Sequence, residues 1–412
     1  MKNFSRFGLA AASLLAFAAF EQGSQVNAVG RPPEASSGPF RVLAPIESGD
    51  LLLFPVVRTL GKSLAAGETP FITLDEGIKN GEVEVTEAGH VQGLVRPRGA
   101  AQNNNRYPDP AQNSYRGDQV NSLVLVNNSQ KPLLLLAGEI VTGGKQDRVI
   151  AKDRIVPVGA DPIDLGVFCI EPGRWTESSS TFGAAAKTPS HGFMVQPTVR
   201  ERAMVQKDQE QVWDSVRGAI SQMAVAAAPP PSPNSASSPS ASSFGTTSYA
   251  KVMESNAVSE KVDEAAAPVM KSRDQILAKL REERAIGVIV AVRGEIVWAD
   301  LFADPELLSR YWTKLVRSYA AESLADGESH AAPTVSDAEH FLDAPSGGTE
   351  TSEGSVGVYR YRELKSGGTS TFVLESLLPG TGYDVHISKM KSSSGGRRAP
   401  KPQPSLSPQI YR

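Results

Sequence analysis

Cysteine is nearly absent from this sequence, which has one, Cys169, among 412 residues. A single cysteine cannot form an intrachain disulfide, so an ordinary hydrophobic core must stabilise the fold. Histidine is also scarce, and the five histidines are too dispersed to form the closely spaced ligand motif of a metal site. We therefore expect no bound metal. The sequence also lacks the short motifs of zinc proteases, serine hydrolases and dinucleotide-binding folds, so we expect no cofactor.

Long hydrophobic runs are missing after residue 20. The one apolar run, residues 7–20, is shorter than the roughly 20 residues that a membrane-spanning helix needs. A basic start precedes it, and the small-residue pattern Val26-Asn27-Ala28 follows it. This order is typical of a secretory signal peptide, here residues 1–28 with cleavage after Ala28. We therefore predict an exported protein, periplasmic or secreted, without stable membrane insertion after cleavage. The alternative is an N-terminal membrane anchor.

Neither sign of charge dominates the sequence. There are 42 basic and 45 acidic residues, which gives a formal net charge of -3. This balance argues against a general nucleic-acid-binding protein and against binding to anionic membranes. The local exception is the tail, residues 391–412, which combines basic residues with Pro, Ser and Gly and has no acidic residue. We expect this tail to be disordered.

The remaining chain divides into two patterned parts with a low-complexity stretch between them. Residues 29–42 are rich in Pro and Ser and predict a spacer, and short apolar runs predict a β-rich first part over residues 43–225. Residues 226–269 begin with a run of Ala, Ser and Pro that has little to bury, so we expect a disordered linker inside the domain. Patterned sequence resumes over residues 270–390.

The second part contains the clearest local patterns. The apolar run 285–292, the turn Arg293-Gly294 and residues 295–299 predict a β-hairpin. Asp304 followed by Pro305 predicts the start of an amphipathic helix. Together with the short strands elsewhere, these patterns predict an α+β fold in which mostly antiparallel β-sheets pack with a few amphipathic helices.

The chemistry of the chain concentrates in residues 137–175. Period-two alternation in the run 165–171 places Cys169 and Glu171 on one face of a strand. Glu139 lies at the edge of another buried strand. Glu139 or Glu171 could act as a general acid or base, and Cys169 could act as a nucleophile if a positive field lowered the pKa of its thiol. The alternative for Cys169 is that it packs as a small apolar side chain, which an apolar strand favours.

Hydrogen-bond donors gather in two turns of the same stretch. Gly143-Gly144 permits a tight turn, and donors or aromatic rings suited to a polar or anionic ligand follow it and the later Pro172-Gly173 turn. These candidate ligand-binding residues are Lys145, Gln146, Arg148, Arg174 and Trp175. The alternative is a set of internal ion pairs that join strand ends. A buried unpaired charge is costly, so both alternatives require these charges to find partners.

Three segments, GEIVTGGKQDR, VFCIEPGRW and VIVAVRGEIVWADLFADPELLSRYWTKLVRSYA, resemble the ARG and rhodanese-phosphatase-superfamily-associated domain family of bacteria. The likeness covers about residues 45–225 and 270–390. The family pattern has Ala-Lys-Gln-Asn-Arg where this chain has Gly144-Lys145-Gln146-Asp147-Arg148, so an acid replaces an amide at Asp147. The resemblance implies that both patterned parts form one unit, and it implies no settled activity.

Three hypotheses of function remain open on the sequence. The first is an exported binding or scaffold protein whose polar pocket receives a small anionic or polar ligand or a protein partner. The second is a hydrolase or transferase that uses a Glu acid/base or Cys169 as nucleophile. The third is a polar cluster that serves only the structure. The first two require the turns around Lys145 and Arg174 to meet in space.

Overall fold

The computed structural model describes residues 39–59, 69–87, 123–172, 179, 181–184, 192–228, 241–271, 273–343, 348–381 and 384–391. The predicted signal peptide with its Ala28 cleavage site, residues 29–38 of the spacer, Arg174, Trp175 and the tail beyond Lys391 lie outside the described residues. The described residues all belong to one compact unit.

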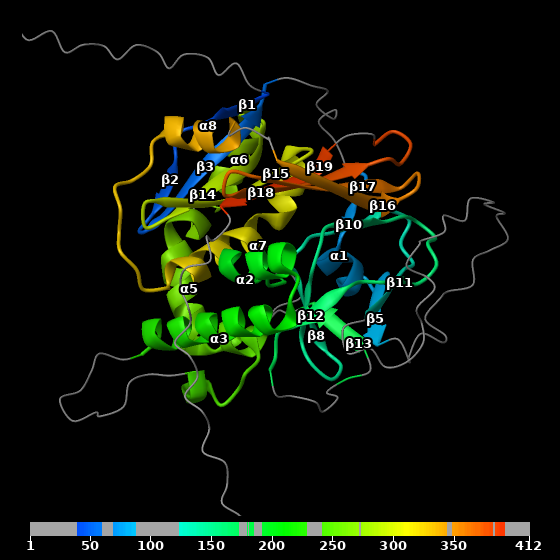
Figure 1. Ribbon diagram of the computed structural model, residues 1–412, viewed down its shortest axis with the longest axis horizontal. Helices are drawn as coiled ribbons and strands as arrows, with labels where there is room; N and C mark the ends of the chain where they lie inside the picture. The colour runs from blue at the N-terminus through cyan, green and yellow to red at the C-terminus, as the bar shows by residue number, and fades with distance from the viewer. Residues whose placement is uncertain are drawn as a thin grey trace, which may run out of the picture. The chain divides into compact units, whose positions relative to one another are not determined.

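The predicted α+β fold is confirmed, and its largest element is a nine-stranded antiparallel sheet (Figure 1). Along the sheet the strands are β1 (Phe40–Val42), β3 (Leu51–Arg58), β14 (Ala285–Val292), β15 (Glu295–Phe302), β19 (Asp384–Lys391), β18 (Thr369–Ser376), β17 (Tyr359–Ser366) and β16 (Thr349–Ser355), and β2 (Ile46–Ser48) pairs with β3. A strand from the first patterned part, β3, therefore pairs directly with a strand from the second, β14.

The centre of this sheet is the predicted hairpin, which the structure confirms as β14 and β15. All eight residues of β14 are buried, because helices cover both faces of the sheet at this point. The turn places Arg293 and Gly294 at positive φ. A side chain at Gly294 would put its Cβ 2.4 Å from the carbonyl oxygen of His330, so this turn requires glycine.

Helices α5 (Asn256–Lys271), α6 (Arg273–Glu282) and α7 (Pro305–Ser323) contact one side of the sheet. The predicted start of α7 is confirmed: Oδ1 of Asp304 accepts a hydrogen bond from the Leu307 amide at 2.9 Å, and Pro305 occupies the first turn. On the opposite face, α8 (Val335–Asp343) packs Ala338 and Phe341 into a separate apolar cluster with β3, β14 and β15.

Two smaller sheets form a second β-region with its own core. One has the order β11 (Ile163–Asp164), β6 (Leu123–Asn127), β5 (Val83–Glu87), β13 (Thr181–Ala184), β8 (Ile140–Gly143), β9 (Arg148–Ile150) and β12 (Val167–Cys169). The other has the order β10 (Arg154–Val156), β7 (Leu133–Leu135) and β4 (Ile72–Thr73). Helix α1 (Leu74–Lys79) follows β4 and begins with a capping box between Thr73 and Glu76.

The predicted disordered linker, residues 226–269, is wrong over the part that the structure describes. After α2 (Pro197–Glu201), the π-helical turn at Arg202–Gln206 and α3 (Gln209–Ala226), a short 3₁₀ turn at Ala241–Phe244 leads into α4 (Tyr249–Glu254) and α5. Val258, Val262, Ala266 and Val269 repeat at helical spacing and are fully buried. Their burial supplies the stabilisation that the Ala-, Ser- and Pro-rich composition seemed to lack. Residues 229–240 lie outside the described residues.

The predicted spacer, residues 29–42, is also too long at its C-terminal end. Residues 40–42 form β1, which pairs antiparallel with β3 through the partners Phe40–Arg58, Arg41–Val57 and Val42–Val56. Val42 is buried at 5% exposure. This segment is therefore ordered by pairing with a strand more than ten residues further along the chain. The composition of the segment itself cannot predict that pairing.

Candidate functional site

Glu139, the first predicted site residue, lies in the connection between β7 and β8 and is fully buried. One carboxylate oxygen, Oε2, accepts a hydrogen bond from the Leu136 amide at 2.7 Å, and the other, Oε1, lies 2.6 Å from Nζ of Lys314 on α7. The same ammonium lies 2.7 Å from Oδ2 of Asp75 on α1. Burial disfavours the charged form of Lys314, but Asp75 and Glu139 outweigh it and raise the pKa of its ammonium.

The Gly-Gly-Lys-Gln-Asp-Arg turn between β8 and β9 is held from several sides. A Cβ atom at Gly144, whose φ is +50°, would lie 2.2 Å from the ring of Phe182, so the turn can close only with glycine there. Asp147 accepts hydrogen bonds from the Gly143 amide at 3.3 Å and from the Ser248 hydroxyl at 2.5 Å. Ser248 also caps α4, so a segment predicted as linker fixes this turn.

Glu171 meets this turn, as the binding and enzyme hypotheses require. Its Oε2 accepts a hydrogen bond from the Asp147 amide at 3.3 Å, and the Ile170 amide donates to the Asp147 carbonyl at 3.0 Å. Glu171 is 2% exposed. Arg174 and Trp175 lie outside the described residues, so their predicted role in the second turn stays a prediction.

Arg148 and Cys169 lie opposite each other in the pairing of β9 with β12. The Arg148 guanidinium donates to the Gln146 carbonyl at 2.6 Å and is 1% exposed, and the Gln146 side chain is fully buried. Burial raises the pKa of the Cys169 thiol ahead of the opposing effect of Arg148. A buried thiol with a raised pKa is a poor nucleophile, so this geometry favours packing over catalysis at Cys169.

Lys145 differs from its neighbours because its side chain is 42% exposed. Its ammonium lies 3.8 Å from a carboxylate oxygen of Glu87, and its backbone amide donates to the same carboxylate at 3.0 Å. The predicted donor set is therefore split: Lys145 reaches solvent, whereas Gln146 and Arg148 are enclosed.

A second buried network, which the sequence reasoning missed, surrounds His386 on β19. Its Nδ1 lies 2.6 Å from Oδ2 of Asp153, and its Nε2 lies 3.1 Å from Oδ1 of Asp300 on β15. Asp300 also accepts from the Arg200 guanidinium at 2.8 Å and from the Tyr319 hydroxyl at 2.5 Å. The other three charged residues of this network come from positions far apart in the sequence, and all are at most 1% exposed.

The charges of this network fix its protonation. Burial lowers the pKa of His386, but the two carboxylates outweigh burial and raise this pKa to about 9. Burial raises the pKa of Asp300, but Arg200 and His386 together hold it well below its usual range. At neutral pH His386 and Arg200 are therefore both cations, and Asp300 is an anion. The sequence offered one hint, an aspartate among the apolar residues that follow Glu295 in β15.

The turn of Ala137, Gly138 and Glu139 joins the two buried networks. The Ala137 amide donates to Oδ1 of Asp153 at 2.7 Å, and Glu139 binds Lys314. Between them Gly138 has φ of +93°, and a Cβ atom there would lie 2.8 Å from Cδ of Arg200. The guanidinium of Arg200 in turn stacks over the Trp298 ring at 4.6 Å. In both networks the buried carboxylates lie within ion-pair distance of cationic side chains of the same chain.

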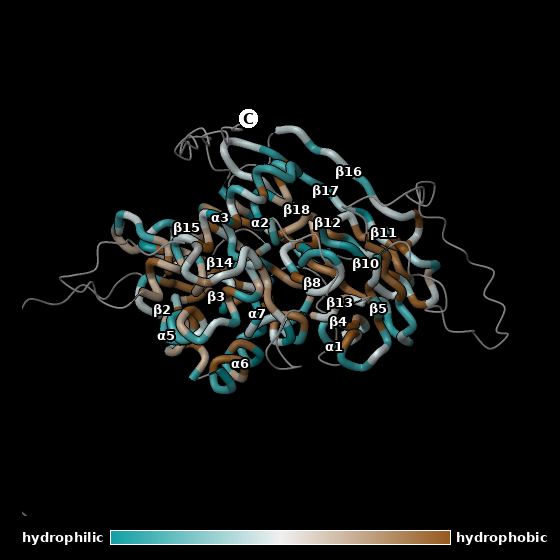
Figure 2. The backbone as a smooth tube through the Cα atoms, turned by 90° about the horizontal axis from the view of Figure 1, so that it is seen from below, coloured by the Kyte–Doolittle hydropathy of each residue, from teal (hydrophilic) through white to brown (hydrophobic). Residues whose placement is uncertain are grey.

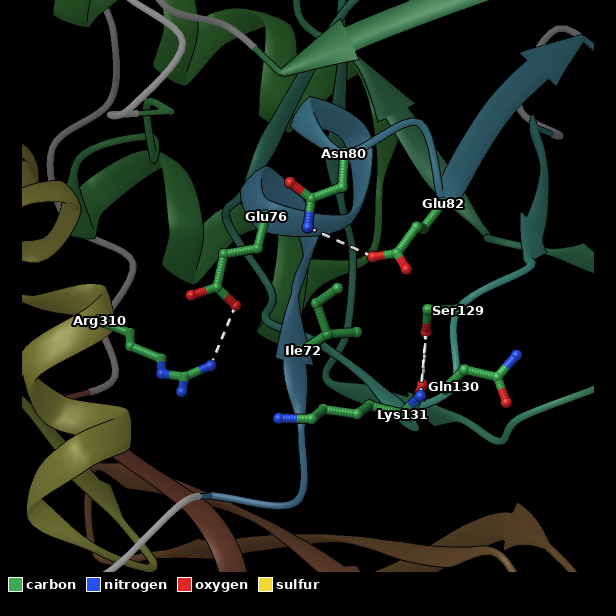
Figure 3. A pocket seen from close by; sticks show the side chains of 8 residues that line it. All are labelled: Ile72, Glu76, Asn80, Glu82, Ser129, Gln130, Lys131 and Arg310. Carbon is green, nitrogen blue, oxygen red and sulfur yellow. Dashed lines mark hydrogen bonds and ion pairs between the residues drawn. The ribbon is translucent and has the colours of Figure 1, made fainter.

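An open pocket of about 350 Å³ lies beside the ion pairs of Lys314, where α1, the β6–β7 connection and α7 meet (Figure 3). Its lining residues are Ile72, Glu76, Asn80, Glu82, Ser129, Gln130, Lys131 and Arg310. Nη1 of Arg310 lies 3.1 Å from Oε2 of Glu76, and Nδ2 of Asn80 donates to Glu82 at 3.3 Å. Sequence reasoning gave no weight to these residues, because they come from three separate segments that carry no shared motif.

The Lys131 side chain is exposed and runs toward the side of the pocket where Arg310 lies (Figure 3). Among the described residues no carboxylate pairs with its ammonium. The pocket is also tied to the first buried network: Glu76 and Asp75 are consecutive on α1, and their partners Arg310 and Lys314 are one turn apart on α7.

Within the described ranges, no group of His, Cys, Asp and Glu side chains is arranged to hold a metal ion. None of the helices in that part of the chain is both long and apolar enough to cross a membrane. A family model described as the ARG and Rhodanese-Phosphatase-superfamily-associated Protein domain matches residues 39–390. No curated protein and no solved structure matches the chain.

Proposed function

We propose that this chain, which belongs to the ARG and Rhodanese-Phosphatase-superfamily-associated Protein domain family, is an exported protein. We further propose that it binds a small anionic ligand. The binding site is the pocket between α1, the β6–β7 connection and α7. The observation that carries this proposal is the ammonium of Lys131, which lines the pocket with no carboxylate partner among the described residues.

The charges of the pocket favour an anion with a polar end. Arg310 and Glu76 neutralise each other at 3.1 Å, so Lys131 is the cation left to attract a carboxylate or phosphate group. Among the described residues, the Glu82 carboxylate accepts a hydrogen bond from the Asn80 side-chain amide alone, so it can accept a further one. A compound that joins an anionic group to a hydroxyl or amino group therefore matches the lining.

The residues that the sequence predicts to bind or catalyse are occupied by contacts within the fold, which supports the pocket as the binding site. Glu139 is paired with Lys314, and Cys169 is buried with its backbone bonded to the Gln209 side chain. A group that serves as a general acid or base must reach a substrate proton within about 3 Å, and a fully enclosed carboxylate cannot. These contacts favour a binding protein over the hydrolase or transferase alternative.

Export is supported by the sequence of residues 1–28 alone, with its basic start, apolar run and Ala28 site. The test is the intact mass of the full-length gene product recovered from a bacterial periplasm or culture medium. Export predicts a chain that begins at residue 29. A protein that stays in the cytosol with residues 1–28 attached would contradict it.

The binding proposal is tested by thermal unfolding of the chain with inorganic phosphate or citrate, against sodium chloride at equal ionic strength. A ligand that binds only the native state raises the midpoint as its concentration exceeds the dissociation constant. We expect one of the two anions to raise it, and Lys131→Gln to abolish that rise. Lys279→Gln, which removes an exposed charge on α6, is the matched control and should keep the rise. No rise beyond that of chloride, or an equal rise in Lys131→Gln, would contradict the proposal.

A further inference from the structure

The outer strand of the large sheet, β16, is an unusually exposed edge. It is the last strand of the sheet and pairs only with β17. Its first six residues, Thr349 to Gly354, are all exposed. Because successive side chains of a strand point to opposite faces, this run means that neither face of β16 is covered. Figure 2 shows β16 at the margin of the chain, coloured neutral to hydrophilic.

The backbone of β16 has hydrogen-bonding capacity left over. Half of the amides and carbonyls of an edge strand point away from its one neighbour. In the described chain, no backbone hydrogen bond reaches residues 349–354 from any strand except β17. The other edge strands of the three sheets have two or three residues each, whereas β16 has seven. Short edge strands limit unwanted pairing with other chains. With seven residues, β16 is too long to be protected in this way.

The charges on β16 are already neutralised from within the chain. Glu353 lies 2.9 Å from the ammonium of Lys152, and Glu350 lies 3.8 Å from the guanidinium of Arg362. Lysine and proline, the residues that most often block an edge, are both absent from the strand. The edge therefore offers Thr, Ser, Gly and two charge-paired Glu residues to an incoming strand.

The sequence of β16 is complementary to itself in one antiparallel register. The register that pairs all seven residues is centred on Ser352 and places Thr349 opposite Ser355, Glu350 opposite Gly354, and Thr351 opposite Glu353 of a second copy. No carboxylate faces a carboxylate directly in this arrangement, and Ser352 faces its own counterpart. A shift of the register by one residue, which puts Glu350 opposite Glu353, would bring like charges together and is disfavoured.

An exposed apolar side chain lies at the end of the same strand. Val356, in the turn after β16, is 82% exposed, the largest value among the large hydrophobic residues of the described chain. In the register centred on Ser352 it falls opposite Gly348 of the second copy, which has no side chain to block it. Pairing would therefore cover an apolar side chain at each end of the joined strands.

We propose that β16 pairs with β16 of a second copy of this chain and forms a two-fold symmetric dimer with a continuous sheet across both copies. Two-fold symmetry follows because the same surface serves on both sides of an antiparallel, self-complementary pair. One strand pair buries less than the roughly 1,200 Å² of a standard interface, so the dimer is weak and its population depends on protein concentration. This dimer is independent of ligand binding at the α1–α7 pocket.

The test is sedimentation equilibrium of the full chain over increasing concentration. We expect a monomer–dimer equilibrium that Ser352→Glu weakens about fivefold, because two carboxylates then face each other across the axis. Substitutions at position 351 should act in opposite directions. Thr351→Lys faces Glu353 of the second copy and should tighten the dimer about fivefold, whereas Thr351→Glu should weaken it.

Ser221, an exposed residue on α3, supplies the controls. Ser221→Glu and Ser221→Lys change the net charge by the same amounts and should leave the dimer constant unaltered. Thermal unfolding checks that every variant folds. A chain that stays monomeric at all concentrations would overturn the proposal. So would a dimer that Ser352→Glu leaves intact, or one that responds equally to substitutions at positions 351 and 221.

Discussion

Nε2 of His386 lies 3.1 Å from Oδ1 of Asp300, and neither side chain has any exposed surface. The other ring nitrogen is bound to Asp153 at 2.6 Å, so the imidazolium is enclosed between two carboxylates. Each charge of this network depends on the others, because an ion left alone in a protein interior is costly. The network joins the large sheet to the Ala137–Glu139 turn.

The stability of the protein should fall as pH rises through the pKa of His386. This pKa is raised to about 9 in the folded state from an ordinary value of 6.5. The stabilisation is therefore fully present below about pH 6.5 and is lost as pH rises through about 9, with a total on the order of 3 kcal/mol. Urea unfolding between about pH 6 and pH 10 measures it.

His340 provides the control for this pH dependence, because it is exposed on α8. His386→Gln should lower stability at neutral pH and flatten the fall between pH 6 and 10, whereas His340→Gln should leave the profile unaltered. Asp300 acts in the opposite range: its pKa is lowered, so its stabilisation is present at neutral pH and is lost in acid. A wild-type profile that is level up to pH 10 would be evidence against the imidazolium.

Removing the ammonium of Lys314 should destabilise the protein strongly. Lys314→Met removes the ammonium that pairs with both Glu139 and Asp75, and Glu139 is then a fully buried carboxylate without a cation. Breaking a buried ion pair from one side costs about 3–5 kcal/mol. Urea unfolding gives the free energy, and the double variant Lys314→Met with Glu139→Gln should recover part of the loss. A single-variant cost close to that of Lys279→Met, on exposed α6, would contradict the role of this ion pair.

Gly138→Ala should cost more than a positive φ alone explains. At Gly138, with φ of +93°, a Cβ atom meets Cδ of Arg200 at 2.8 Å, so backbone strain and a steric clash add together. Gly166 has φ of +57° and no atom within 4 Å of its Cβ position, so Gly166→Ala tests the strain alone. We expect about 1 kcal/mol at Gly166 and at least about twice that at Gly138. Equal costs would show that Arg200 moves aside freely.

Cys169 should resist thiol reagents in the folded protein. The side chain is 1% exposed and burial raises the pKa of its thiol, and thiol reagents require the thiolate. An aromatic disulfide reagent should label native protein at least about 100-fold more slowly than protein unfolded in urea. Cys169→Ala should keep the anion-induced rise of the melting midpoint. Rapid labelling of the native chain would reopen the nucleophile hypothesis.

Local patterns carried the sequence predictions that the structure confirms. The β14–β15 hairpin and the start of α7 each depend on residues adjacent in the sequence, such as Arg293-Gly294 and Asp304-Pro305. The prediction of disorder is wrong over residues 241–269, because it gave composition more weight than period. The buried positions 258, 262, 266 and 269 have helical spacing, and a Pro- and Ser-rich run just before them drew attention away from it.

The candidate site was predictable only in part, for a physical reason. Buried charges at Glu139, Arg148 and Glu171 had to find partners, and that requirement could be derived from the sequence. The partners themselves could not: Lys314 is 175 positions from Glu139, and His386 is 233 positions from Asp153. The open pocket was missed for the same reason, since α1, the β6–β7 connection and α7 meet only after folding.

Because β3 pairs with β14, each of the two patterned parts needs the other to cover its apolar strand edge. The first part contributes β1, β2 and β3 to a sheet that the second part otherwise builds, and β14 is buried on both faces. A chain cut between residues 228 and 241 would yield two fragments, each with a long apolar strand edge exposed to water. Neither should be soluble alone, whereas co-expression should restore the fold, so the yield of soluble protein measures the pairing of β3 with β14.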